Sequence, residues 1–202
     1  MAEMMDSCNR LRSPIPHRIF ALAIIFLLCA AAWAPRAHAQ FEAPGPDFAS
    51  AIRDNNYKKF RECIVSGLNV NDKTTDGTPL LVLASQLGRT QMVMELAANG
   101  ARLNDRDDEG DTALTSAIRH SRNDTVTTLL KLGADPDLDG ARGETPLLIA
   151  VITNNVTVVR ALIAAKADLD TADYTGLTPL GAAEQRRNNR VANMLREAGA
   201  GL

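Results

Sequence analysis

The sequence has few of the residues from which catalytic and metal sites are usually built. Its 202 residues include three cysteines, three histidines and one tryptophan, and aromatic residues make up 4%. Two of the cysteines, two of the histidines and the tryptophan lie within positions 1–39, so positions 40–202 keep one cysteine, Cys63, and one histidine, His120. That part of the chain cannot form an internal disulfide. It also lacks the three or four Cys and His ligands of a typical zinc site.

The motifs of common enzyme classes are missing as well. No GxGxxG or P-loop pattern is present, so nothing indicates nucleotide binding. A Ser-His-Asp arrangement could use only His120, with Ser121 and Asp124 nearby, and we interpret that histidine as solvent-facing. Without positions 1–39 the chain has 18 Lys and Arg against 22 Asp and Glu, which is not the basic balance that recruits nucleic acid. We expect no enzyme, no cofactor and no nucleic-acid partner.

Positions 1–39 have the three parts of a secretory signal peptide. Positively charged residues up to Arg18 precede sixteen uncharged residues at 19–34, and Ala37-His38-Ala39 follows. We predict cleavage after Ala39, leaving an exported chain with a short linker at 40–45. The leader is typical of bacteria, which predicts the periplasm and no membrane attachment after cleavage. The alternative is an uncleaved anchor in the inner membrane, although sixteen residues fall short of the roughly 20 that span a bilayer.

The rest of the chain is an internal repeat, in which similar residues recur at one constant offset. An invariant alanine indicates a helix packed closely against its neighbour. Leucine and valine positions three apart share one face of a second helix. A glycine position ends that helix in a left-handed conformation, which should cost Lys166 about 1 kcal/mol. The aligned positions are Ala51, Ala84, Ala117, Ala150 and Ala183; Phe48, Leu81, Leu114, Leu147 and Leu180; Cys63, Leu96, Leu129, Leu162 and Leu195; Phe60, Val93, Val126, Val159 and Ala192; and Gly67, Gly100, Gly133, Lys166 and Gly199.

The sequence motifs within each repeat resemble those of the ankyrin repeat family. Gly-x-Thr-Pro-Leu occurs at 143–147 and 176–180, a weaker form at 110–114, and Gly-Ala-Asp at 133–135. The resemblance implies an all-α repeat solenoid, a stack of helix-turn-helix units joined by hairpin-like loops over 46–202. We expect a monomer. The units are an N-terminal cap repeat at 46–75, then 76–108, 109–141 and 142–174, and a C-terminal cap repeat at 175–202.

The chain departs from the family pattern in two informative places. The usual histidine after Thr-Pro-Leu is replaced by Leu148, Thr115 and Gly181, so the hydrogen bond it makes between units must be supplied in another way. In the 76–108 unit, the pair Thr78-Pro79 comes one residue early. We therefore expect a distorted start of the helix that follows it.

The acidic run at 105–111 allows two interpretations. Oxygen-rich turns can hold calcium, but the run lacks the closing glutamate of an EF-hand. Asp107 also stands where ankyrin units commonly place a turn aspartate, and Asp173 stands at the matching position two units later. We favour a solvated turn at a hairpin tip and predict no metal.

The resemblance also implies where a partner binds. In ankyrin-like stacks, loop tips and the exposed side of the first helices line a concave face where other proteins dock. We therefore predict a module or adaptor that binds an unidentified protein in the periplasm. An inhibitor that protects against a secreted enzyme is an alternative, and an enzyme or ligand carrier is a remote one. The predicted contact residues, all expected to face outward, are Arg106, Asp108, Asp111, Arg119, His120, Arg142, Glu144, Ile152, Thr153, Tyr174, Leu177, Gln185 and Arg186.

Cys63 occupies a position that leucine holds in the other four units. We predict that it is buried between the first two units, where cysteine behaves as a small hydrophobe. A reactive thiol is the alternative, because Lys58, Lys59 and Arg61 lie nearby in the sequence.

Overall fold

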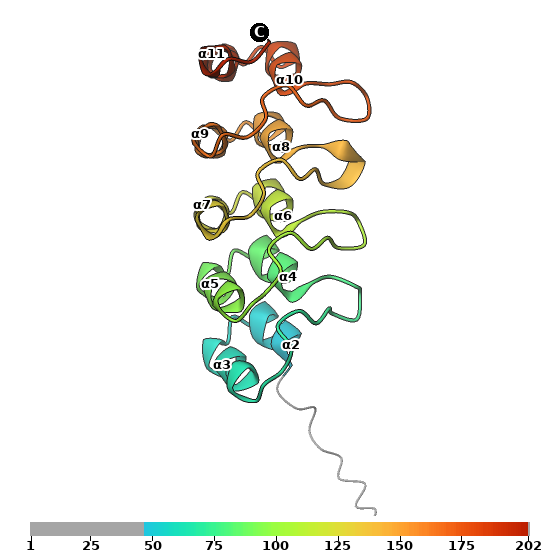
Figure 1. Ribbon diagram of the computed structural model, residues 1–202, viewed down its shortest axis with the longest axis vertical. Helices are drawn as coiled ribbons and strands as arrows, with labels where there is room; N and C mark the ends of the chain where they lie inside the picture. The colour runs from blue at the N-terminus through green and yellow to red at the C-terminus, as the bar shows by residue number, and fades with distance from the viewer. Residues whose placement is uncertain (1–46, 202) are drawn as a thin grey trace, which may run out of the picture. The chain divides into compact units, whose positions relative to one another are not determined.

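The computed structural model describes residues 47–201; the predicted signal peptide and the linker at 40–45 lie outside them. The described residues form ten α-helices, one short 3₁₀ helix and no strand. Figure 1 shows the helices as pairs stacked one above another, with a hairpin projecting from the same side of the stack between successive pairs. The all-α repeat architecture is therefore confirmed. None of the described helices has the length and apolar character needed to cross a membrane.

Every unit holds a short first helix and a longer second helix. From the second unit onward, both helices begin at the same offset in each unit, so the sequence period is the period of the structure. The first helices are α2 (Phe48–Arg53), α4 (Leu80–Gln86), α6 (Ala113–Arg119), α8 (Pro146–Ile152) and α10 (Pro179–Gln185). The second helices are α3 (Tyr57–Val65), α5 (Thr90–Ala98), α7 (Asn123–Leu132), α9 (Val156–Ala164) and α11 (Asn189–Ala198).

Threonine caps start three of the first helices. The Thr145 hydroxyl accepts a hydrogen bond from the Leu148 N–H, and Pro146 fills the first helical position, where a missing N–H costs nothing. Thr178 and Pro179 repeat this arrangement at α10. At α4 the early threonine leaves Pro79 at the cap position, with no side-chain hydrogen bond. The helix still starts in register, so the shift removes the cap without moving the helix.

The core follows the aligned positions of the sequence. The five alanines of the first helices are buried, and their small side chains let neighbouring helices approach closely. On the second helices, Phe60, Val93, Leu96 and Leu129 have no exposed surface. Cys63 is also 0% exposed, as its leucine-like position predicts.

Two of the left-handed positions recur in all five units. The glycine position ends the second helix, with φ of 93° at Gly133, and Lys166 adopts the same conformation with φ of 61°. The second position lies in the turn between the two helices and is left-handed in all five units. Only one of its residues is glycine, so its conformation could not be recognised from the sequence. Its members are Asn55, Gly88, Ser121, Asn154 and Arg187.

Side chains in the loops join each unit to the next. The Asn71 side chain accepts a hydrogen bond from the Arg102 N–H at 2.9 Å, and Asn104 accepts one from the Asp135 N–H at 3.1 Å. Asp137 and Asp170 stand at the same position of the following units. Their carboxylates accept the equivalent hydrogen bonds from the N–H groups of Asp168 and Gly201. Two arginines add further links: Arg89 donates to the Ile52 carbonyl and Arg122 to the Gln86 carbonyl. These bonds supply the connection between units that the family's histidine would otherwise make.

Candidate protein-binding surface

The predicted contact residues fall in two rows along the stack. One row lies on the projecting hairpins and the other at the C-terminal ends of the first helices. Seven members are exposed: Asp108, His120, Arg142, Thr153, Tyr174, Gln185 and Arg186. Four more are partly buried: Arg106, Arg119, Ile152 and Leu177.

Asp111 and Glu144 do not lie on the exposed surface, so that expectation is wrong for these two residues. They are 6% and 8% exposed. Both carboxylates bind Arg119, whose Nε lies 3.0 Å from Asp111 and whose Nη2 lies 2.5 Å from Glu144. Burial opposes the charge of Arg119. The hydrogen bond to Glu144 and the two negative charges outweigh that effect and raise the pKa of the guanidinium.

Arg119 therefore links the third unit to the fourth. Its side chain is 25% exposed and one edge reaches solvent. Arg119 therefore faces outward only in part, unlike Tyr174. Arg119 neutralises two buried carboxylates, so its main role is to stabilise the contact between the units. Only its exposed edge is left to contact a partner.

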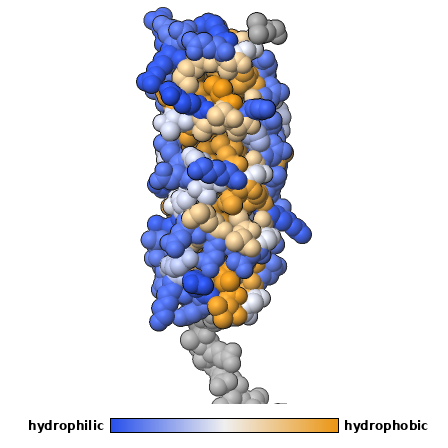
Figure 2. Space-filling model, turned by 60° about the vertical axis from the view of Figure 1, so that its left-hand side comes forward, coloured by the Kyte–Doolittle hydropathy of each residue, from blue (hydrophilic) through white to orange (hydrophobic). Residues whose placement is uncertain are grey.

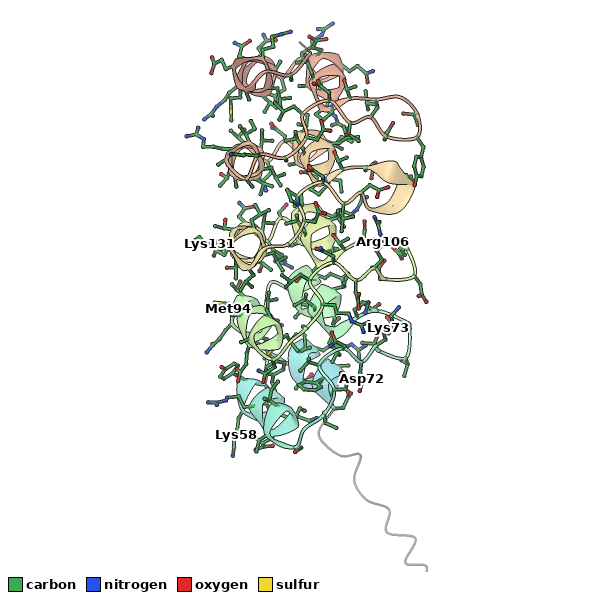
Figure 3. The ribbon with its side chains drawn as sticks, viewed as in Figure 1. Lys58, Asp72, Lys73, Met94, Arg106 and Lys131 are labelled. Atoms are coloured by element: carbon green, nitrogen blue, oxygen red, sulfur yellow. The ribbon has the colours of Figure 1, made fainter. Side chains whose placement is uncertain are left out.

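Arg106 makes a similar link between the second unit and the third. Its guanidinium donates to the Gly110 carbonyl at 2.8 Å and forms an ion pair with Asp139 at 2.7 Å. Figure 3 places Arg106 on the hairpin side of the stack. Asp139 was not among the predicted residues, because nothing in its loop marks it as a partner of a residue in the preceding unit.

Tyr174 is the most exposed aromatic residue of the described chain, at 81%. One side of its ring lies against Gly143 of the preceding hairpin, where a Cβ atom would overlap the ring. Gly143 also has a φ of 73°, so both space and backbone conformation favour glycine. The Tyr174 hydroxyl lies 3.5 Å from the Asp139 carboxylate. The ring is therefore supported on one side and open to solvent on the other.

The acidic run forms a hairpin turn. The Asp107 carboxylate accepts hydrogen bonds from the backbone N–H groups of Glu109 and Asp111, at 3.0 and 2.8 Å. Asp173 accepts the equivalent bonds from Thr175 and Leu177. The favoured interpretation of this run, a turn at a hairpin tip, matches this geometry. Within residues 47–201 no three His, Cys, Asp or Glu side chains are grouped as metal ligands.

His120 lies at the end of α6 with its side chain exposed. Its Nδ1 atom is 2.8 Å from the Ser116 carbonyl oxygen, and its Nε2 atom is 3.4 Å from the Gln86 amide nitrogen. The imidazole is thus oriented by a backbone carbonyl of its own helix. A carboxylate would be needed there for the triad arrangement.

The opposite side of the stack has a different surface. Figure 2 shows hydrophobic residues in a band along the second-helix side. The exposed large hydrophobic residues of the second helices are Val65, Met94 and Leu132, at 83%, 46% and 38%. Lys58 and Lys131 lie on this side too, as Figure 3 shows. None of these residues belongs to the predicted contact set.

Comparison with known proteins agrees with the geometry. The family model for ankyrin repeats (three copies) matches residues 48–139 and 133–202. A search of the curated proteins finds no match to this chain. The matched segments cover nearly the whole helical stack and most of the chain, and they include the Thr-Pro-Leu helix starts. The chain therefore belongs to the ankyrin repeat family.

Proposed function

We propose that the protein is an exported adaptor that binds a partner protein through its concave face. Ankyrin repeats indicate a module for protein–protein interaction. The observation that carries the proposal is the pair of Tyr174 and Arg142, two exposed residues on successive hairpins, where the Tyr174 N–H donates to the Arg142 carbonyl at 3.4 Å. Tyr174 is 81% exposed and the Arg142 side chain is 75% exposed. Tyrosine and arginine are enriched among the residues that dominate binding energy at protein interfaces.

We propose that the protein acts by binding and not by catalysis. The one histidine of the described stack is oriented by the Ser116 carbonyl, and the acidic turn uses the Asp107 carboxylate to hold its own backbone. These groups are already engaged in structural hydrogen bonds. A rigid stack with an exposed face is suited to holding a partner in place.

Site-specific cross-linking tests this function. A photoreactive amino acid at Thr153, which is exposed on the first-helix row, should capture the partner in cells that export the protein. The same amino acid at Thr127, exposed on α7 of the opposite side, is the matched control. Mass spectrometry identifies the product. Capture from Thr127 with none from Thr153 would show that the face is assigned wrongly.

The location of the protein is a separate proposal. We infer that it works in the periplasm after removal of residues 1–39, because small residues follow an apolar segment of limited length. Intact-mass measurement on protein from an exporting bacterial host should give a chain that starts at Gln40. A full-length mass in the membrane fraction would support the anchored alternative. If the captured partner is a secreted enzyme that the protein inhibits, the protective role would replace the adaptor role.

A further inference from the structure

Charge is unevenly distributed over the stack. The segments between units, residues 66–79, 99–112, 133–145 and 165–178, carry fourteen acidic and five basic side chains, a net charge of −9. The other described residues carry seven acidic and thirteen basic side chains, a net charge of +6. The hairpins project from these acidic segments (Figure 1). A partner that approaches the hairpins therefore meets a negative field, which attracts a cationic surface.

The two basic side chains of the hairpins at 105–111 and 139–144 are already paired. Arg106 binds Asp139, and Arg142 lies 3.3 Å from Glu144. Asp173, directly before Tyr174, has no ion pair within the described residues. Its carboxylate is held by the Thr175 hydroxyl at 2.7 Å and the backbone N–H of Leu177 at 3.0 Å. These hydrogen bonds lower the pKa of Asp173, so the negative charge persists into acid.

Tyr174 adds an aromatic surface to this acidic edge. The inner face of its ring lies against Gly143, which fixes the ring, and the outer face is open. The face of an aromatic ring carries negative electrostatic potential and attracts Lys or Arg side chains. The negative charge of the neighbouring Asp173 increases that attraction.

We propose that the hairpin edge, formed by residues 105–111, 139–144 and 173–177, binds a basic segment of the partner protein and places one Arg or Lys side chain on the open face of Tyr174. This inference rests on the proposed function, since it names the chemistry of the partner at the same face. The segment runs along the hairpin tips, where Asp108 and Glu109 offer further exposed carboxylates. The apolar band on the second-helix side takes no part in it.

Binding of a model peptide tests the inference. A fluorescently labelled peptide of alternating glycine and arginine is titrated with the full-length protein at low ionic strength, and anisotropy reports binding. A peptide of alternating glycine and glutamate is the charge control. We expect binding of the arginine peptide alone, and weaker binding as salt is added. Tyr174→Ala should weaken binding about three- to tenfold, the size of a cation–π contact.

Matched variants separate the ring from the charge. Tyr174→Phe keeps the aromatic face and should restore binding to within about twofold of the wild-type protein. Tyr57→Phe changes the other tyrosine of the chain, on α3, and should have no effect. Equal binding by Tyr174→Ala, or tighter binding of the glutamate peptide, would overturn the inference. If Thr153 still captures a partner while the arginine peptide does not bind, the proposed function stands and the partner chemistry is wrong.

Discussion

The carboxylate of Asp111 occupies the space beside Gly140 in the next hairpin. A Cβ atom at Gly140 would overlap the Asp111 Oδ1 atom, which accepts a hydrogen bond from the Ala141 N–H at 3.1 Å. Two other hairpins have an aspartate at this position, Asp107 and Asp173, and each caps its own turn. The hairpin at 139–144 has glycine instead, so the Asp111 carboxylate of the preceding hairpin enters and caps the turn.

This relationship predicts that a side chain at position 140, including the aspartate of the other hairpins, destabilises the protein. Gly140→Ala and Gly140→Asp should each cost about 1–3 kcal/mol, because the new side chain displaces Asp111 and disturbs its pairing with Arg119. Urea unfolding of the full chain measures the change. Gly181→Ala, in the first turn of α10, is the matched control and should be neutral or stabilising.

A double variant tests whether Asp111 takes the place that an aspartate at position 140 would occupy. Asp111→Leu reproduces the residue that the last unit has at this position, Leu177. With Asp111 gone, an aspartate at position 140 can cap its own turn. The combined loss in Gly140→Asp with Asp111→Leu should therefore be smaller than the sum of the single losses. Strict additivity would mean that Asp111 and position 140 do not compete for the same space.

Removal of Arg119 should destabilise the stack more than removal of an exposed arginine. Arg119→Met leaves the buried carboxylates of Asp111 and Glu144 without their shared cation, and we expect a loss of about 1–3 kcal/mol given its partial exposure. Arg196→Met breaks an exposed pair with Glu184 and should cost less than about 1 kcal/mol. Equal unfolding midpoints for the two variants would show that the Arg119 network adds no stability.

These examples show what the sequence could and could not predict. The repeat period predicted the helices and the buried positions, because each aligned position has the same environment in all five units. The prediction failed for Asp111 and Glu144, whose aligned position holds Thr78 and Leu177 in two other units. When an aligned position holds unlike residues, the sequence does not indicate whether the side chain faces inward. The partner of these carboxylates, Arg119, belongs to a different aligned position, and only the folded stack brings the three together.

Lys166 should be replaceable by glycine with a gain in stability. Its φ of 61° is left-handed, which disfavours residues with a Cβ atom, and the equivalent positions in the other units are glycine. Lys166→Gly should stabilise the protein by up to about 1 kcal/mol, reduced by the greater freedom of glycine in the unfolded chain. Ala165→Gly, at a residue with φ of −78°, should destabilise it. Thermal unfolding compares the two, and a loss of stability in Lys166→Gly would contradict the strain.

Asp173 should make the stability of the last hairpin depend on acid pH. Hydrogen bonds from the Thr175 hydroxyl and the Leu177 N–H lower its pKa below the ordinary value of about 3.9. The resulting stability is present above that ordinary value and is lost as the pH falls through the lower pKa of the folded state. Asp173→Asn should therefore have a lower Tm than the wild-type protein at neutral pH, and the two values should converge below about pH 4. Asp124→Asn, which removes a carboxylate on α7, is the charge-matched control. A constant Tm difference across this range would contradict the linkage.

Cys63 should be inert in the folded protein in spite of the basic residues near it. It is 0% exposed on α3, three residues after the equally buried Phe60. Burial is the main cause that raises the pKa of the thiol, and Lys59 offsets it only in part, so little of the reactive thiolate forms. A thiol reagent should label the native protein slowly and the denatured protein rapidly. Cys63→Ser should cost about 1–3 kcal/mol, because it places a hydroxyl in an apolar site, whereas Cys63→Ala loses only packing. Fast labelling of the native chain, or a disulfide-linked dimer on a non-reducing gel, would show that the first unit opens and that the thiol is accessible.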